Sequence, residues 1–209
     1  MSGYKPKLIG KETIFIDDSV VFGENVTIYP NNIIWGKCTI SSGTVLMSNN
    51  YIVDSDIGEN CVIDHSYIEK STIGDECKVG PFSRLRPNSK IGNGCKIGNF
   101  VEIKNSVIGD NTKASHLSYI GDSEIGKNCN IGCGAIFVNY NGIKKSKTVV
   151  EDDCFIGSNA NIIAPVTIAK GSYICAGTTV TKSTDVDDFL IGRASVVVKK
   201  NYGIKYRKK

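Results

Sequence analysis

The chain has 209 residues, of which 41% are hydrophobic, and a net charge of +4. This length suffices for one domain with its own core. The positive excess is confined to the C-terminus, where Lys199, Lys200 and the tail after them supply six charges. Such a tail is usually a solvated terminus, and a contact with a phosphorylated ligand is the alternative. Because the rest of the chain lacks the basic stripe of nucleic-acid-binding proteins, we expect no nucleic-acid partner.

The N-terminus, Met-Ser-Gly-Tyr-Lys-Pro-Lys, contains no apolar stretch of signal-peptide length. No window of the chain approaches the roughly 20 apolar residues that a membrane helix requires. We therefore expect a cytoplasmic protein with no membrane partner. Its eight cysteines are then not expected to form disulfides, and the lack of a Cys-x-x-Cys pair argues against a zinc ribbon.

After a short N-terminal segment, residues 1–19, an aliphatic or aromatic residue recurs in steps of six or five. The series comprises Phe22, Ile28, Ile34, Ile40, Leu46, Ile52, Ile57, Ile63, Ile68, Ile73, Val79, Leu85, Ile91, Ile97, Ile103, Ile108, Ala114, Ile120, Ile125, Ile131, Phe137, Val150, Ile156, Ile162, Ile168, Ile174 and Val180. A helix needs an apolar residue about every 3.6 positions and a strand one about every 2, so neither fits. The period predicts very short strands joined by tight corners.

Coils built in this way stack at a strand spacing of about 4.8 Å. No single repeat buries its apolar face, so the stack must fold as a unit. We therefore predict an all-β parallel β-helix, or solenoid, over residues 20–183, with an inserted loop at 138–149. Residues 184–209 are expected to form a C-terminal arm that includes the basic tail.

Six cysteines occupy one repeat position, four residues after a repeat aliphatic. They are Cys38, Cys61, Cys77, Cys95, Cys129 and Cys154, and other repeats place Val26, Thr44 or Ser83 there. The position thus selects a small side chain, and free cysteine behaves as a small buried hydrophobe. We expect these cysteines to be structural.

The polar, basic loop at 138–149 is the main interruption of the repeat. Loops on a rigid scaffold often carry function, although a tolerated insertion explains this one equally well. Of the two histidines, His65 is interpreted as structural or as a surface residue. His116 follows repeat residue Ala114 by two positions and should face outward. Glu102 is expected on the matching face of the previous coil, where it would orient the imidazole, which would then suit general base catalysis.

Arg86 and Lys104 each follow a repeat aliphatic and lie one coil apart, so they should stack on the outer surface. Two stacked cations repel each other, and a phosphate between them would relieve the repulsion. Ordinary solvated charges are the alternative. Together with His116 and the basic loop, the pair favours a phosphate site.

Several longer motifs go beyond the generic repeat. They are Gly-Pro-Phe-Ser-Arg-Leu-Arg-Pro at 80–87, Gly-Asn-Phe-Val-Glu-Ile-Lys-Asn at 98–105, Lys-Ala-Ser-His-Leu-Ser-Tyr-Ile-Gly-Asp at 113–122, Asn-Ile-Gly-Cys-Gly at 130–134 and Asn-Tyr-Asn-Gly at 139–142. With these motifs the chain resembles the acetyltransferase domain of bacterial bifunctional N-acetylglucosamine-1-phosphate uridyltransferase/glucosamine-1-phosphate acetyltransferase, a hexapeptide-repeat acyltransferase. The resemblance implies a left-handed helix and a homotrimer with active sites between subunits. It also implies acetyl transfer from acetyl-CoA to the amine of glucosamine 1-phosphate, for UDP-N-acetylglucosamine synthesis.

The resemblance also implies residue roles. His116 would be the general base, supported by Glu102. The amino-sugar phosphate would be bound by Arg86, Lys104, Tyr119, Asn130 and Lys145. Acetyl-CoA would lie along Cys133, Asn139, Tyr140, Ser158 and Ala176, and Arg193 would meet its phosphates. No metal is implied for this step.

The chain departs from the family pattern in three places. Cys133 stands where the family usually has Ala, the run Ile136-Phe137-Val138 where it has a Thr and a Cys, and Asn141 where it has Asp. Phe137 and Asn141 are expected to reshape the acceptor pocket. No Gly-rich phosphate loop precedes the repeats, so uridylyl transfer is not expected.

Three other functions compete with this interpretation. An acyltransferase for another amino sugar or for a nucleotide-linked one would share the fold, and the Arg86–Lys104 pair with His116 argues for a sugar 1-phosphate instead. A zinc enzyme resembling γ-class carbonic anhydrase needs three histidines, and the chain has two. A non-catalytic trimeric scaffold remains open, although the complete set of site residues argues against it.

Overall fold

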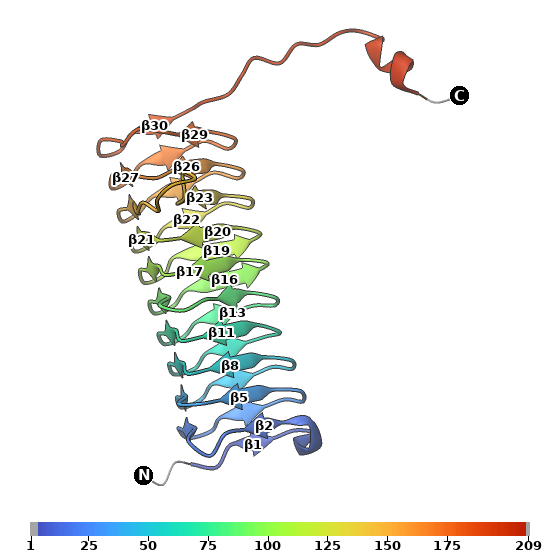
Figure 1. The fold of residues 1–209 in the computed structure, drawn as a ribbon, viewed down its shortest axis with the longest axis vertical. Helices are drawn as coiled ribbons and strands as arrows, with labels where there is room; N and C mark the ends of the chain where they lie inside the picture. The colour runs from blue at the N-terminus through green and yellow to red at the C-terminus, as the bar shows by residue number, and fades with distance from the viewer. Residues whose placement is uncertain (1–3, 208–209) are drawn as a thin grey trace.

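The computed structural model describes residues 4–207, and almost all of their regular structure is β. Strands of two to four residues form three parallel sheets, here named A, B and C (Figure 1). The predicted all-β solenoid is therefore confirmed.

Sheet A contains, in order, β1 (Lys7–Leu8), β4 (Thr27–Ile28), β7 (Val45–Leu46), β10 (Val62–Ile63), β13 (Lys78–Val79), β16 (Lys96–Asn99), β19 (Lys113–His116), β22 (Asn130–Ile131), β25 (Phe155–Ile156), β28 (Tyr173–Ile174) and β30 (Phe189–Leu190). Sheet B contains β2 (Phe15–Ile16), β5 (Ile33–Trp35), β8 (Tyr51–Val53), β11 (Tyr67–Glu69), β14 (Arg84–Leu85), β17 (Glu102–Lys104), β20 (Tyr119–Gly121), β23 (Ile136–Val138), β26 (Asn161–Ile163) and β29 (Thr179–Val180). Sheet C contains β3 (Val21–Phe22), β6 (Thr39–Ile40), β9 (Asp56–Ile57), β12 (Thr72–Ile73), β15 (Lys90–Ile91), β18 (Val107–Ile108), β21 (Ser123–Ile125), β24 (Thr148–Val150) and β27 (Val166–Ile168). Two short 3₁₀ helices are η1 (Lys11–Thr13) and η2 (Tyr202–Tyr206).

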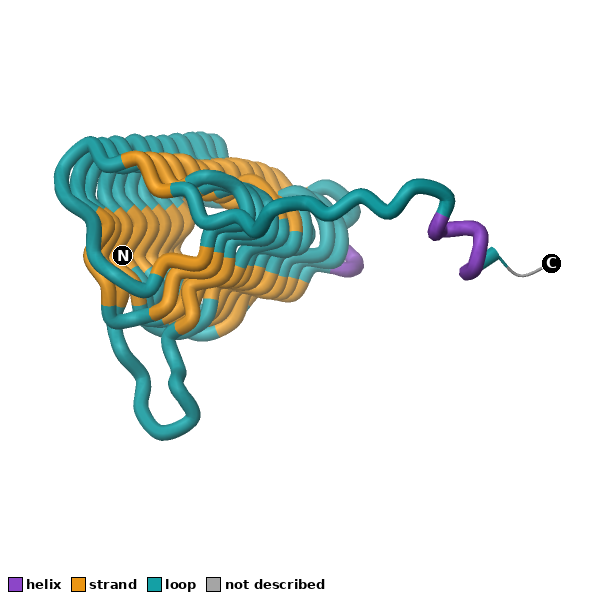
Figure 2. Tube along the Cα trace, turned by 90° about the horizontal axis from the view of Figure 1, so that it is seen from above, coloured by secondary structure: helices purple, strands orange, loops and turns teal. Residues whose placement is uncertain are grey.

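Apart from β30, which pairs with β28, each strand pairs with the strand three positions away in the chain, so three strands make one coil of a triangular prism (Figure 2). The pairing keeps repeat residues in line: Leu85 pairs with Ile103, and Ile103 with Ile120. These aliphatic side chains are fully buried. The core is thus a set of stacked columns of apolar side chains. Stacking buries apolar surface that a single coil would leave exposed, and this burial stabilises the fold.

The cysteine position behaves as predicted, because all six of those cysteines are buried. Cys175 is also buried, and Cys133 is exposed. Cys61 Sγ lies 3.4 Å from the backbone nitrogen of Cys77, so the thiols follow one another up the inside of the stack. Burial raises the pKa of the Cys38 thiol, which keeps it in the neutral form that suits a core.

The ladder of strands extends past the predicted limits of 20 and 183. Strand β1 pairs with β4 and strand β2 with β5, and at the other end β30 pairs with β28. The apolar step is less regular at both ends, so the sequence pattern alone does not mark these coils. The insertion lies between β23 and β24, where one loop projects from the prism (Figure 2).

Beyond β30 the chain leaves the stack as an extended arm (Figure 1). Residues 191–207 of this arm are exposed. The last two residues of the basic tail, 208–209, lie outside the described residues. Over the described part, no helix is long and apolar enough to span a membrane.

Replacing Phe137 by Ala tests whether this position belongs to the core. Phe137 is the largest of the fully buried side chains, at 0% exposed. We expect the free energy of unfolding to fall by roughly 3–5 kcal/mol, because a cavity replaces the ring. Urea unfolding followed by circular dichroism measures this change. Phe15→Ala is the control, since that ring is 62% exposed. Equal losses in both variants would contradict a core role for Phe137.

Candidate active site

One exposed edge of the prism, between sheets A and B, carries His116 at the end of strand β19. Backbone hydrogen bonds align the coils above it: Gly134 N donates to Leu117 O and Asn159 N to Cys133 O, both at 2.8 Å. One coil further, Gly177 N donates to Ser158 O, also at 2.8 Å. The pairs Ala114–Ile131, Ile131–Ile156 and Ile156–Ile174 are in register, so the residues two positions after them form one column. This column consists of His116, Cys133, Ser158 and Ala176, all exposed.

The structure thus brings together the predicted base and three of the predicted acetyl-CoA residues. Successive coils are about 4.8 Å apart, so the column from His116 to Ala176 is about 14 Å long. Its side chains above the imidazole are small. At Gly132, just before Cys133, an added Cβ would lie 2.5 Å from Ser158 N, so only glycine allows the coils to approach this closely.

A second group of residues lies on the outer face of sheet B. Glu102 pairs with Tyr119, and Lys104 with Gly121. Arg86 and Lys104 occupy equivalent positions in adjacent coils, as predicted. Each cation also meets a carboxylate: Arg86 Nη1 lies 2.8 Å from Glu102 Oε1, and Lys104 Nζ lies 3.4 Å from Asp122 Oδ2. The repulsion expected from the sequence is therefore partly relieved within the chain.

Glu102 has a different partner from the one expected. Its carboxylate bonds to Arg86 on sheet B, whereas His116 belongs to sheet A and pairs there with Asn99. Within residues 4–207, no hydrogen bond joins Glu102 to the imidazole. The expectation that Glu102 lies on the matching face of the previous coil is therefore wrong, because β17 belongs to sheet B and β19 to sheet A.

Asp122 connects the cation group to the base of the inserted loop, and sequence reasoning did not single it out. Its carboxylate accepts hydrogen bonds from Asn105 Nδ2, at 2.7 Å, and from Asn139 Nδ2. Burial raises the pKa of Asp122, but these hydrogen bonds and the charge of Lys104 outweigh burial and lower it. The sequence does contain a signal for this cluster. Asn105 and Asn139 each lie 17 residues, or about one coil, from Asp122, so the three side chains stack.

The loop itself is closed at its base. Ser146 N donates to Asn139 O at 2.8 Å, and Tyr140 forms a bridge with Lys145. Asn141 Oδ1 accepts from the backbone nitrogens of Ile143 and Lys144, at 3.0 and 2.9 Å. Asn141 therefore shapes the turn, a role that an Asp can fill equally well. Phe137 is fully buried, so the expectation that it reshapes the acceptor pocket is wrong.

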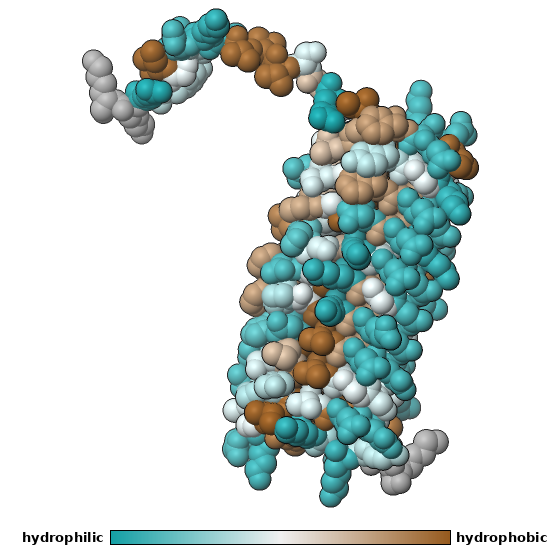
Figure 3. Space-filling view, turned by 180° about the vertical axis from the view of Figure 1, so that it is seen from behind, coloured by the Kyte–Doolittle hydropathy of each residue, from teal (hydrophilic) through white to brown (hydrophobic). Residues whose placement is uncertain are grey.

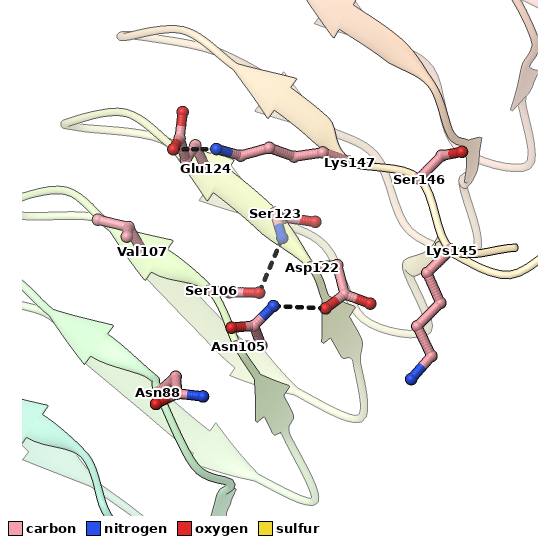
Figure 4. Close-up of a pocket in the computed structure, with 10 residues that line it drawn as sticks. All are labelled: Asn88, Asn105, Ser106, Val107, Asp122, Ser123, Glu124, Lys145, Ser146 and Lys147. Atoms are coloured by element: carbon pink, nitrogen blue, oxygen red, sulfur yellow. Dashed lines mark hydrogen bonds and ion pairs between the residues drawn. The ribbon is translucent and has the colours of Figure 1, made fainter.

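Lys145 extends from this loop beside Asp122 (Figure 4). The neighbouring Lys104 lowers the pKa of Lys145, and the charge of Arg86 adds to the effect. Arg86, Lys104 and Lys145 thus lie near one another, beside the corner between sheets B and C. A groove of about 400 Å³ adjoins them, lined by residues that include Asn105, Asp122 and Lys145.

Tyr119 joins the cation group, whereas Asn130 does not. An added Cβ at Gly121 would lie 2.5 Å from the Tyr119 hydroxyl and 2.8 Å from Asn139 Nδ2, so glycine leaves room for both groups. Asn130 lies on sheet A in strand β22. Arg193 lies in the exposed arm beyond β30. One copy of the chain therefore does not bring all the predicted residues into a single site.

Comparisons with known proteins agree with this architecture. The family described as the GMPPB C-terminal domain matches residues 67–142, and the family of bacterial transferase hexapeptides (six repeats) matches residues 147–182. The bifunctional protein GlmU of Caldicellulosiruptor saccharolyticus is 46% identical over 187 residues, covering 90% of this chain and 40% of the relative. GlmU of Clostridium beijerinckii is 47% identical over 187 residues, covering 90% of this chain and 41% of that relative.

The chain is a hexapeptide-repeat protein that resembles the C-terminal region of GlmU. It spans about two fifths of the length of these relatives. Among solved structures, the UDP-N-acetylglucosamine acyltransferase of Arabidopsis superposes with a TM-score of 0.58 at 19% identity, covering 83% of this chain and 68% of that one. The Campylobacter jejuni enzyme of the same name gives 0.51 at 19% identity, covering 97% and 79%. These two likenesses concern the fold, which is a left-handed parallel β-helix.

Replacing Asp122 by Asn tests its role at the corner. The substitution keeps the shape but removes the charge that holds Lys104, and we expect a loss of about 2 kcal/mol in the free energy of unfolding. The folded pKa lies below the ordinary value of 3.8, so this stabilisation is present above that value and is lost as the pH falls through the folded pKa.

Urea midpoints of wild type and Asp122→Asn should therefore differ at pH 7 and converge as the pH falls below the folded pKa of Asp122. The matched control is Glu124→Gln, which breaks the exposed pair with Lys147 and should cost less than about 1 kcal/mol. A difference that persists unchanged at low pH would show that the charge of Asp122 is not what stabilises the corner.

Proposed function

We propose that this chain is an N-acetyltransferase that transfers acetyl from acetyl-CoA to the amine of glucosamine 1-phosphate. The product would be N-acetylglucosamine 1-phosphate, the precursor of UDP-N-acetylglucosamine. The observation that carries the proposal is the column in which His116 stands in line with Cys133, Ser158 and Ala176. The similarity to GlmU over 90% of the chain supports a hexapeptide acyltransferase.

The column fits an extended thioester substrate. Small side chains leave the backbone of this edge accessible, and the edge is long enough for a pantetheine arm to lie along it. Asn139 and Tyr140 lie at the base of the inserted loop, at the corner between sheets B and C, so they would border the same substrate from a second copy of the chain. Arg193 would pair with its phosphates, since a guanidinium binds phosphate through two parallel hydrogen bonds.

His116 would act at the end of this column. Its exposed imidazole accepts a proton from the amine of the sugar as the nitrogen attacks the thioester carbon. The new C–N bond forms while the C–S bond breaks, and the departing thiolate is protonated. Histidine suits this task because imidazole exchanges protons near neutral pH.

The cation group on sheet B would bind the sugar phosphate. Arg86, Lys104 and Lys145 converge there, and Lys104 lowers the pKa of Lys145 because the two ammonium groups repel each other. A phosphate dianion would relieve this repulsion. Tyr119 would contact the sugar from the neighbouring position on the same face. Glu102 would then position Arg86, its partner in the structure.

The placement of Asn130 supports a site shared between copies of the chain. Asn130 lies on sheet A, and Tyr119 on sheet B. Outward side chains on two faces of a convex edge point apart, so one small sugar cannot touch both within a single copy. A second copy would bring its sheet A opposite the cation group. We therefore propose a homotrimer with the acceptor bound between subunits.

Acetyl transfer is tested by measuring thiol release from acetyl-CoA with glucosamine 1-phosphate, glucosamine and glucosamine 6-phosphate. We expect turnover only with the 1-phosphate. Because Cys133 is exposed, the thiol reagent will also label the protein, so only release well beyond one thiol per chain counts as turnover. Turnover with a nucleotide-linked amino sugar instead would reassign the acceptor. No thiol release with any of these acceptors would favour a non-catalytic scaffold.

His116→Ala should lower kcat by about 10²–10⁴-fold, because the general base is lost. The fold should be unchanged, since the imidazole is exposed. His65→Ala is the matched control and should keep its activity. A His116→Ala variant that retains near-normal turnover would remove this residue as the base.

Arg86→Gln should raise the KM for glucosamine 1-phosphate by about tenfold or more, through loss of a charge-assisted contact worth roughly 1.5–3 kcal/mol. The KM for acetyl-CoA should change little, because Arg86 is not in the His116 column. Lys90→Gln, an exposed lysine on sheet C, controls for net charge. An unchanged KM for the sugar phosphate would contradict the phosphate assignment.

A further inference from the structure

The C-terminal arm makes no contact through hydrogen bonds with the prism once it has left the last coil. Its last such tie is the bond that Gly192 N donates to Thr178 Oγ1, at 3.1 Å. From there to Arg207, the backbone hydrogen bonds of the arm stay within the arm, as from Tyr202 N to Lys199 O at 3.3 Å. All residues of this stretch are exposed. Their side chains are therefore available to a partner outside the chain.

The end of the arm carries only positive charge. From Lys199 onward the sequence contains six basic residues and no acidic one: Lys199, Lys200, Lys205, Arg207, Lys208 and Lys209. The residues before Lys199 together carry a net charge of −2. Up to Arg207, none of these cations has a carboxylate within ion-pair distance in the described part of the chain. An anionic surface would therefore attract the arm and not the prism.

An apolar run directly precedes these cations. Val196, Val197 and Val198 are 88%, 79% and 79% exposed. Figure 3 shows an apolar group on the arm, clear of the prism, with hydrophilic groups on both sides of it. Three adjacent aliphatic side chains in water lose the stabilisation that burial would give them. The run therefore lacks an apolar partner that one copy of the chain does not supply.

Tyrosine and lysine side chains gather around the 3₁₀ helix η2 that follows. Lys199 Nζ lies 5.2 Å and Lys205 Nζ 4.4 Å from the centroid of the Tyr202 ring. The rings of Tyr202 and Tyr206 have centroids 6.1 Å apart. Tyrosine is enriched at membrane–water interfaces, where its ring lies at the level of the lipid headgroups. The end of the arm thus combines cations with aromatic rings suited to such an interface.

We propose that residues 196–207 bind the surface of an anionic phospholipid bilayer. The cations contact lipid phosphates through charge-assisted hydrogen bonds, and the valine run enters the boundary between headgroups and acyl chains. Stable attachment to a bilayer surface takes two signals, and the arm supplies charge and apolar side chains together.

A nucleic acid would match the charge of the arm but would leave the valine run in water, so a bilayer fits better. The expectation of no membrane partner rested on the lack of a spanning segment. A segment that lies on the surface needs no spanning helix. The proposal does not depend on the acetyltransferase proposal, because the prism takes no part in it.

The test is co-sedimentation of the full chain with vesicles of phosphatidylcholine, alone or with one quarter phosphatidylglycerol. We expect binding to the mixed vesicles only, and weaker binding as salt screens the charges. Lys199→Gln/Lys200→Gln should bind about tenfold more weakly, because each cation near an anionic leaflet adds to the affinity. The control Lys11→Gln/Lys90→Gln removes the same charge from exposed lysines outside the arm and should bind within about twofold of wild type. Equal weakening in both variants would show that only net charge matters, which overturns the site.

The triple variant Val196→Ser/Val197→Ser/Val198→Ser keeps the charge and removes the apolar signal. It should bind the mixed vesicles about tenfold more weakly than wild type. The control Val107→Ser, at a position 43% exposed on sheet C, should bind like wild type. Unchanged vesicle binding by the triple variant would overturn the insertion of the valine run.

Two further measurements separate the bilayer from other partners. If wild type binds oligouridylate but not the mixed vesicles, the arm belongs to a nucleic acid and the proposal is overturned. Light scattering without vesicles gives the subunit number. A lower number in the triple variant than in wild type would show that the run packs on another copy, which also overturns the proposal. Thermal unfolding confirms that each variant is folded.

Discussion

The structure depends on one constraint, the hydrogen-bonded stacking of each coil on the previous one at a single strand spacing. The bonds from Arg86 N to Ile103 O and from Gly132 N to Ile156 O, at 2.8 and 2.7 Å, are two examples. Because every coil repeats the same path, a side chain's position within its coil decides which column it joins. Inward positions make the aliphatic core, and outward positions make continuous rows of like groups. Any site on this protein is therefore a combination of rows.

The candidate active site uses two such rows and one interruption. The small side chains above His116 form a smooth edge, whereas the row with Arg86 and Lys104 concentrates positive charge on sheet B. The inserted loop begins at the corner where Asp122 and Asn105 lie, one coil above Asp122 and two coils above Asn105. Asp122 fixes Asn139 at the base of this loop, so the same carboxylate holds a cation and locates Lys145. A regular stack without the insertion would leave this charge on a flat face.

The charge balance of the surface distinguishes the two cation groups. On sheet B, Arg86 and Lys104 each have a carboxylate partner. A phosphate must therefore compete with Glu102 and Asp122 for these cations, so the site selects a ligand by its geometry. On sheet A, Lys96 and Lys113 have no such partner in the described residues.

The sequence by itself determined the fold class, because a period of six fixes short strands, tight corners and an aliphatic core. It also determined the outward position of His116, the stacking of Arg86 with Lys104 and the burial of six cysteines, since these follow from spacing alone. Only the tertiary structure decided the contacts between residues that are not a whole coil apart. Glu102 meets Arg86 instead of His116, and Asn130 lies away from Tyr119. The structure also showed that Asp122 gathers Lys104, Asn105 and Asn139. Coil length varies by a residue and corners change the direction of the chain, so spacing predicts a shared face only for residues a whole coil apart.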